Sequence, residues 1–86
     1  MDWSKIRKFA GDRWEAGRAE HGDTWKERNM YKEALEEIGD LFNYIRKQGE
    51  KTKSKEEIHD LMMTQIKVVE LFELVTKMDE KYNGGA

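Results

Sequence analysis

Four carboxylates lie within eight residues of one another in the segment KEALEEIGDLFNYIRK, residues 32–47. If this segment is an α-helix, these side chains share one arc of its surface, beside an apolar arc. Like charges one turn apart repel each other, and a divalent cation would relieve that repulsion. Mg²⁺ prefers oxygen ligands and keeps water while it bridges phosphates. The pattern therefore predicts metal-assisted attack of water on phosphorus. The four residues are Glu33, Glu36, Glu37 and Asp40.

The spacing of the carboxylates suggests different roles for them. Glu37 and Asp40 form an E-x-x-D pair, and carboxylates at i and i+3 of a helix can share one hard cation, so we predict that they bind Mg²⁺. Glu33 and Glu36, one turn upstream, are predicted to be catalytic, as water-positioning bases or auxiliary ligands. The alternative is a solvated acidic face near the start of a helix, where the helix dipole favours carboxylates.

Three further residues are predicted to bind a substrate at such a site. Asn43 follows Asp40 by three residues and lies at the edge of the acidic arc. Tyr44 lies where the acidic and apolar arcs meet. Trp25 precedes the segment, where it either packs between helices or forms the wall of a pocket for a nucleobase.

The carboxylates require a helix to position them, and apolar periodicity predicts one over residues 25–48. Gly39 in its interior costs on the order of 1 kcal/mol relative to alanine. It would let a neighbouring helix, a ligand or a metal approach closely. The apolar face of this predicted helix consists of Met30, Tyr31, Ala34, Leu35, Ile38, Leu41, Phe42 and Ile45.

An earlier helix is predicted over residues 2–20, with Arg13 and Glu20 on or beside its apolar stripe. Such polar residues either reach the rim of the core or border a ligand cleft. Gly22 is expected to end this helix in the left-handed conformation. Thr24 and Glu27 fit a capping box for the next helix, with Asp23 as an alternative cap. The stripe itself consists of Trp3, Ile6, Phe9, Ala10, Trp14 and Gly17.

The last helix is predicted over residues 54–81, after a polar linker at residues 49–53. Ser54 and Glu57 form a second predicted capping box. The apolar residues between positions 68 and 78 cover more of the helix than two intrachain neighbours can bury. We therefore expect self-association, as a homodimer or a higher homo-oligomer that completes a helical bundle.

Composition sets the outer limits of the interpretation. The 86 residues contain neither cysteine nor proline, and 40% are charged, with a net charge of −2. These features predict a single all-α domain, residues 1–86, without disulfides or thiolate–zinc sites. No basic run alternates with aromatic residues, so nucleic-acid binding is not expected. No membrane span or signal peptide is expected, so we predict a cytoplasmic protein or one made by a virus inside a cell.

The segment EALEEIGDLFNYI resembles the second metal-binding helix of the MazG-like all-α nucleoside triphosphate pyrophosphohydrolases. The preceding GRAEHGDTW is similar to short phage-encoded members, and the resemblance spans residues 14–47. It implies a four-helix Mg²⁺ site, assembly as dimers or tetramers, and cleavage of NTPs or dNTPs between the α- and β-phosphates. Glu37 and Asp40 match the E-x-x-D ligands of the family.

The chain departs from that family in its first acidic motif. An E-E-x-x-E pattern is absent upstream, where Glu15 and Glu20 have the wrong spacing. Glu33 and Glu36 would have to substitute for it. Two hypotheses follow. One is a Mg²⁺-dependent nucleotide pyrophosphohydrolase or a degenerate nucleotide-binding relative. The alternative is a non-catalytic helical protein–protein interaction module of phage or archaeal origin, which the wide apolar stripe favours.

Overall fold

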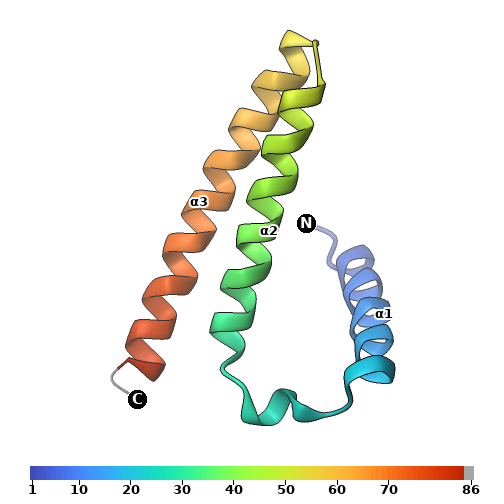
Figure 1. The fold of residues 1–86 in the computed structure, drawn as a ribbon, viewed down its shortest axis with the longest axis vertical. Helices are drawn as coiled ribbons and strands as arrows, with labels where there is room; N and C mark the ends of the chain where they lie inside the picture. The colour runs from blue at the N-terminus through green and yellow to red at the C-terminus, as the bar shows by residue number, and fades with distance from the viewer. Residues whose placement is uncertain (85–86) are drawn as a thin grey trace.

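The computed structural model describes residues 1–84, except for the side chain of His21, and consists of helices joined by short turns (Figure 1). Helix α1 spans Ser4–His21, the 3-10 turn η1 spans Thr24–Glu27, α2 spans Met30–Lys51 and α3 spans Lys55–Asn83. No strand occurs among these residues, which confirms the all-α prediction.

Helices α2 and α3 form an antiparallel hairpin, and α1 stands apart beside α2 (Figure 1). The extensive packing between helices is that of α2 against α3. The radius of gyration is 15.7 Å, whereas a compact domain of this length has about 12 Å. The chain is therefore more open than a self-contained globular domain.

The predicted start of α2 at residue 25 is wrong, as is the capping box of Thr24 with Glu27. Residues 24–27 form the separate turn η1, which has no side-chain cap, because the carboxylate of Asp23 binds Arg18 at 2.8 Å. Arg28 is extended and interrupts the helical path. The true cap is Asn29, whose Oδ1 accepts from the backbone N–H of Tyr31 at 2.9 Å and so satisfies a free donor of the first turn.

The side chain of Asn29 also connects the start of α2 to the end of α3. Its Nδ2 donates to Asp79 Oδ1 at 2.9 Å, and Asn83 Nδ2 donates to the same carboxylate oxygen at 3.4 Å. Beside them the rings of Tyr31 and Tyr82 stack with centroids 6.5 Å apart. The open end of the hairpin is therefore closed by polar and aromatic contacts.

At the other end of the hairpin, the predicted linker at 49–53 is too long. Helix α2 continues to Lys51, where the Thr52 N–H donates to the Gln48 carbonyl at 3.1 Å and ends the helix. Ser54 caps α3 as predicted, accepting from the Glu57 N–H at 3.1 Å. The reciprocal half of the capping box is not formed, because the Glu57 carboxylate accepts from Gln48 at 2.9 Å and Thr52 at 2.8 Å instead.

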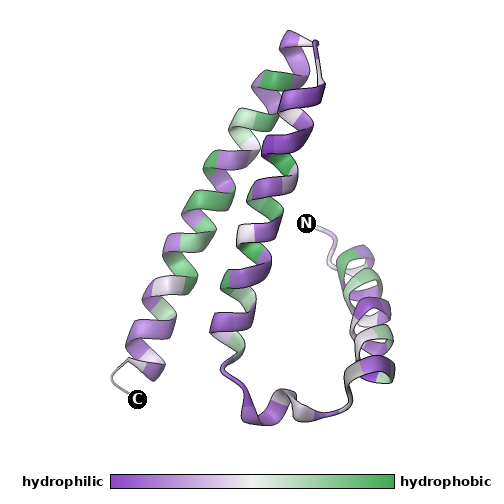
Figure 2. Ribbon diagram, in the orientation of Figure 1, coloured by the Kyte–Doolittle hydropathy of each residue, from purple (hydrophilic) through white to green (hydrophobic). Residues whose placement is uncertain are grey.

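The hydrophobic core is small and lies along the seam of α2 and α3. Only Ile38, Val68 and Val75 are buried among the described residues. The chain exposes 7,624 Å² of surface, whereas a folded monomer of its mass exposes roughly 5,300 Å². Figure 2 shows hydrophobic segments along α1 and along much of α3. The partly buried residues around the core are Tyr31, Ala34, Leu35, Phe42, Ile45 and Met78.

Gly22 was predicted to end a helix in the left-handed conformation, and Gly39 to allow close approach of a helix, a ligand or a metal. Gly22 has φ 76° and ψ −156°, so it ends α1 with positive φ but not in the left-handed helical region. At Gly39 a β-carbon would meet no described atom within 4 Å, so no neighbouring helix approaches it closely. In the described part of the chain, no helix has the length and apolar character needed to cross a membrane.

Candidate functional site

An open cleft of about 560 Å³ separates α1 from the start of α2. It combines aromatic rings, cationic side chains and carboxylates. Helix α1 supplies one wall, while Arg28 and the first two turns of α2 supply the other. The lining residues are Ile6, Phe9, Ala10, Arg13, Trp14, Arg28, Met30, Glu33, Ala34 and Glu37.

The structure divides the four predicted carboxylates between this cleft and the outer surface. Glu33 and Glu37 are one turn apart and both line the cleft, where Glu33 Oε1 lies 3.4 Å from Arg28 Nη1. Glu36 and Asp40 are exposed and are not part of its lining. Asp40 follows one turn after Glu37, beyond the residues of the cleft, because the acidic arc is longer than the wall that α1 faces.

Metal binding by the chain would rest on few protein ligands. Among residues 1–84, no group of three or more acidic, histidine or cysteine side chains is arranged to hold a metal ion. Glu37 and Asp40 remain a predicted pair at i and i+3. A pair of carboxylates suits Mg²⁺ when waters and phosphate oxygens complete the octahedron. Such a pair would leave most of the coordination sphere to groups from outside the chain.

The three predicted substrate-binding residues lie in three different places. Trp25 lines a small pocket at the corner between α1 and η1. Asn43 lies with Gly39 and Phe42 in a groove of about 370 Å³ between α2 and α3. Tyr44 is 73% exposed. The structure thus does not gather them around the cleft.

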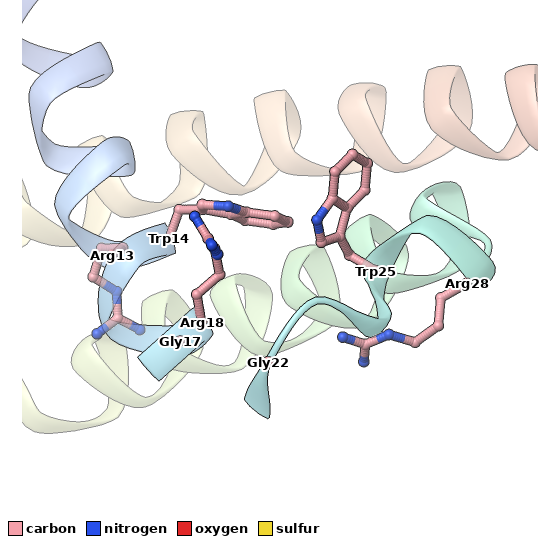
Figure 3. A pocket seen from close by; sticks show the side chains of 7 residues that line it. All are labelled: Arg13, Trp14, Gly17, Arg18, Gly22, Trp25 and Arg28. Carbon is pink, nitrogen blue, oxygen red and sulfur yellow. The ribbon is translucent and has the colours of Figure 1, made fainter. Parts of the chain in front are cut away.

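The pocket at the corner, which we call the arginine–tryptophan pocket, has a volume of about 140 Å³ (Figure 3). The rings of Trp14 and Trp25 meet edge to face with centroids 5.7 Å apart, at an angle of 74°. Arg13, Trp14 and Arg28 line this pocket and the adjoining cleft as well. The pocket is lined by Arg13, Trp14, Gly17, Arg18, Gly22, Trp25 and Arg28.

The cations around the two hollows differ in how well they are neutralised. Arg18 binds Asp23 at 2.8 Å and is 3.5 Å from Glu15. Arg28 has only the 3.4 Å contact with Glu33, which is long for a charge-assisted hydrogen bond. Within the described residues the Arg13 side chain forms neither an ion pair nor a hydrogen bond. Positive charge is therefore available where the pocket joins the cleft.

The sequence left open whether Arg13 reaches the rim of the core or borders a cleft, and in the structure it lines the cleft. Sequence reasoning did not identify Arg28, and it assigned Phe9 and Trp14 to the apolar stripe alone. Arg13 could be found because it interrupts that stripe. Arg28 had no such signal, since its position depends on the break between η1 and α2, which the expected continuous helix concealed.

Comparison with known proteins gives no evidence about the family or the function of the chain. No family model, curated protein or solved structure matches the chain. The resemblance to MazG-like pyrophosphohydrolases therefore stays a prediction that rests on the residues quoted for it.

Proposed function

We propose that the chain binds a nucleoside triphosphate together with Mg²⁺ in the cleft between α1 and α2 and hydrolyses it. One observation carries this proposal. Two carboxylates and two arginines line the same cleft, beside aromatic rings on which a base can stack. The arginines can bind the phosphates of a nucleotide, the carboxylates can bind the metal ion, and the aromatic rings can pack against the base. The residues are Glu33, Glu37, Arg13, Arg28, Phe9 and Trp14.

The chain's own groups suit an attack of water on the α-phosphorus. Mg²⁺ would be held by Glu37, which lines the cleft, and by Asp40 one turn further along α2, and would neutralise charge at the phosphate oxygens. Glu33, which lines the cleft, accepts a proton from the attacking water. The new P–O bond forms as the bond to the α–β bridging oxygen breaks, so a nucleoside monophosphate and pyrophosphate result. Arg13 and Arg28 neutralise the phosphates that leave.

The test is a screen for pyrophosphate release from all NTPs and dNTPs with Mg²⁺. We expect turnover of at least one nucleotide, and a loss of roughly 100-fold or more in Glu33→Gln. Asp40→Asn should abolish Mg²⁺-dependent nucleotide binding. Asp60→Asn, an exposed carboxylate change on α3, is the matched control and should leave both unchanged. If no nucleotide is bound or cleaved with Mg²⁺, the enzyme proposal is wrong.

A second candidate function, that of a helical interaction module, is favoured by the apolar surface of α3. Met62, Ile66, Val69 and Phe72 are each exposed and recur at spacings of three and four residues. We call these residues the α3 stripe. On the other flank of α3, Leu74 is also exposed. A helix that leaves such a stripe uncovered is typical of a chain that packs against a partner.

We propose that the occupant of the α3 stripe is a second copy of this chain. The 7,624 Å² of exposed surface exceeds that of an average folded monomer by roughly 2,300 Å². An interface of standard size removes only about 800 Å² from each partner. Two α2–α3 hairpins packed through the stripe would form a four-helix bundle and remove much of the excess.

Sedimentation velocity at tens of micromolar tests the self-association. We expect a dimer or a larger assembly, and dissociation when Val69→Glu places a charge in the stripe. Leu74→Glu changes an exposed residue on the other flank and should leave the assembly intact. A monomeric parent chain would contradict the proposal, and dissociation by Leu74→Glu alone would assign the interface to the wrong flank.

A further inference from the structure

We infer that the arginine–tryptophan pocket is a phosphate-binding site that works without a metal ion. Arg13 and Arg28 would hold the phosphate groups where the pocket meets the cleft. This inference deepens the proposed function, and it depends on that function only for the identity of the full ligand. Phosphate or pyrophosphate alone is expected to bind.

The first support is the placement of two incompletely neutralised arginines at one junction. Arg13 and Arg28 both line the pocket and the cleft. Arg28 has one long contact, at 3.4 Å from Glu33, and the Arg13 side chain has no ion pair within the described residues. Guanidinium groups match phosphate oxygens with paired N–H donors. An anion at the junction would replace that long contact with short charge-assisted hydrogen bonds.

Arg18 provides an internal contrast. Its Nε lies 2.8 Å from Asp23 Oδ1, so its charge is already neutralised by the turn that follows α1. Arg18 therefore maintains the corner, whereas Arg13 and Arg28 remain available to a ligand. Figure 3 shows the side chain of Arg28, the residue after η1, pointing back toward the turn at Gly22, with Arg13 on the opposite side of the pocket.

The second support is the aromatic wall. The edge-to-face pair of Trp14 and Trp25 forms one side of the pocket. Indole rings lower the local dielectric constant and so strengthen an ion pair that forms against them. They also offer a surface against which the base of a nucleotide can pack. The pocket thus fits an anion that carries an aromatic group better than an inorganic anion alone.

The third support is open space beside the backbone. A β-carbon at Gly17 would meet no described atom within 4 Å, although Gly17 lies inside α1 and lines the pocket. Glycine inside a helix is unfavourable relative to alanine. The backbone of α1 at Gly17 therefore faces open space where the pocket lies. Gly11 shares the same open surroundings in α1 but does not line the pocket.

The experiment titrates the full chain with inorganic pyrophosphate in the presence of a chelator, by calorimetry and by tryptophan fluorescence. We expect binding without Mg²⁺ that weakens as salt is added. Arg13→Gln and Arg28→Gln should each weaken it roughly tenfold or more, the order expected when a charged hydrogen bond is lost. Arg7→Gln, elsewhere on α1, is the matched control and should have no effect. Titration with adenosine monophosphate should give tighter binding than inorganic phosphate if the indole rings contact the base.

The two glycines give a pair of variants that preserve the fold. Gly17→Ala and Gly11→Ala should stabilise α1 equally, because both remove a glycine from a helix interior without a clash. Only Gly17→Ala should weaken pyrophosphate binding, since its methyl group enters the pocket. Equal binding by the two variants would contradict the inference.

Failure of this inference can be told apart from failure of the enzyme proposal. Pyrophosphate binding lost in Arg13→Gln and Arg28→Gln supports the pocket even when no nucleotide is cleaved. Nucleotide cleavage that persists in both variants with unchanged KM overturns the pocket and leaves the carboxylate site standing. Absence of pyrophosphate binding at millimolar concentration also overturns the pocket.

Discussion

The α2–α3 hairpin and helix α1 are stabilised by different kinds of contact. The hairpin has all three buried side chains, a side-chain cap on each helix and polar contacts that close both ends. In α1, none of the residues whose burial is described is buried, and no side chain caps the helix through its N-cap residue Trp3. The hairpin is stabilised from within, whereas α1 relies on the corner that attaches it.

That difference matters because the cleft has one wall in each region. The carboxylates belong to the first turns of α2, which Asn29 caps. The aromatic residues and Arg13 belong to α1, which the Trp14–Trp25 pair and the Arg18–Asp23 ion pair hold in place. One wall is therefore fixed and the other is adjustable. A ligand that bridges them would gain contacts with both walls, and the entropy cost of ordering α1 would be subtracted from its affinity.

The largest expected effect is in the hairpin core. Val68→Ala removes two methyl groups from a side chain that is 5% exposed, and should lower the free energy of unfolding by about 2 kcal/mol. Phe9→Ala in α1, where the ring is 65% exposed, should change it by no more than about 0.5 kcal/mol. Urea unfolding followed by circular dichroism measures both. Equal losses would show that α1 is part of the core.

An intermediate effect is expected at the corner. Trp25→Ala removes the edge-to-face partner of Trp14, a contact of about 1 kcal/mol. Amide hydrogen exchange should then become faster in α1 and remain unchanged in α2 and α3. Trp3→Ala, which alters an exposed indole at the other end of α1, serves as the control. Faster exchange throughout the hairpin would contradict the separation of the two regions.

The smallest expected effect is on the loss of folding stability at low pH. Hydrogen bonds from Gln48 and then from Thr52 lower the pKa of Glu57 below its ordinary value of 4.5. A lowered pKa in the folded chain means that the ionised group stabilises the fold above its unfolded pKa. That contribution is lost as the pH falls through the folded pKa. Glu57→Gln should therefore reduce the loss of stability measured between pH 5 and about pH 3, the range in which such a carboxyl titrates.

Asp2 is the corresponding acid at the start of α1, and it sharpens the comparison. Hydrogen bonds from the Ser4 hydroxyl and then the Ser4 backbone N–H lower its pKa below 3.8. The pKa of Asp2 is shifted in the same direction as that of Glu57, so acid should destabilise the start of α1 as well. Asp2→Asn should change exchange rates in α1 and leave those of the hairpin turn as in the parent. A change at the hairpin turn would show that the two ends titrate together.

The fold was predictable where one local signal decides the structure. Ser54 fits an N-cap, an unbroken apolar pattern follows it, and α3 forms almost as expected. The start of α2 was missed because Thr24 and Asn29 both fit a cap. In the structure Asn29 is the cap, and its side chain is held by a contact with Asp79, which is 50 residues away in the sequence. Local patterns carry no information about such a partner.

The candidate site was predictable as an acidic arc but not as a cleft. Helical spacing correctly placed Glu33 and Glu37 on one side of α2, since that follows from the period of the helix. Which part of the arc faces α1 depends on how the turn at η1 orients α1 relative to α2. Asp40 and Tyr44 lie beyond the cleft for that reason, and Arg28 enters it for the same reason.

The side chain of Asn29 gives the far end of the sequence a role at the beginning of α2. Its amide group caps the helix that carries the carboxylates and is held by a residue in the last two turns of α3. Glu33 N–H in turn donates to the Asn29 carbonyl at 3.2 Å. The start of the helix that carries the first acidic side chain is therefore anchored by a residue 50 positions later in the sequence. The cleft can take its final shape only after α3 has been made and has packed against α2.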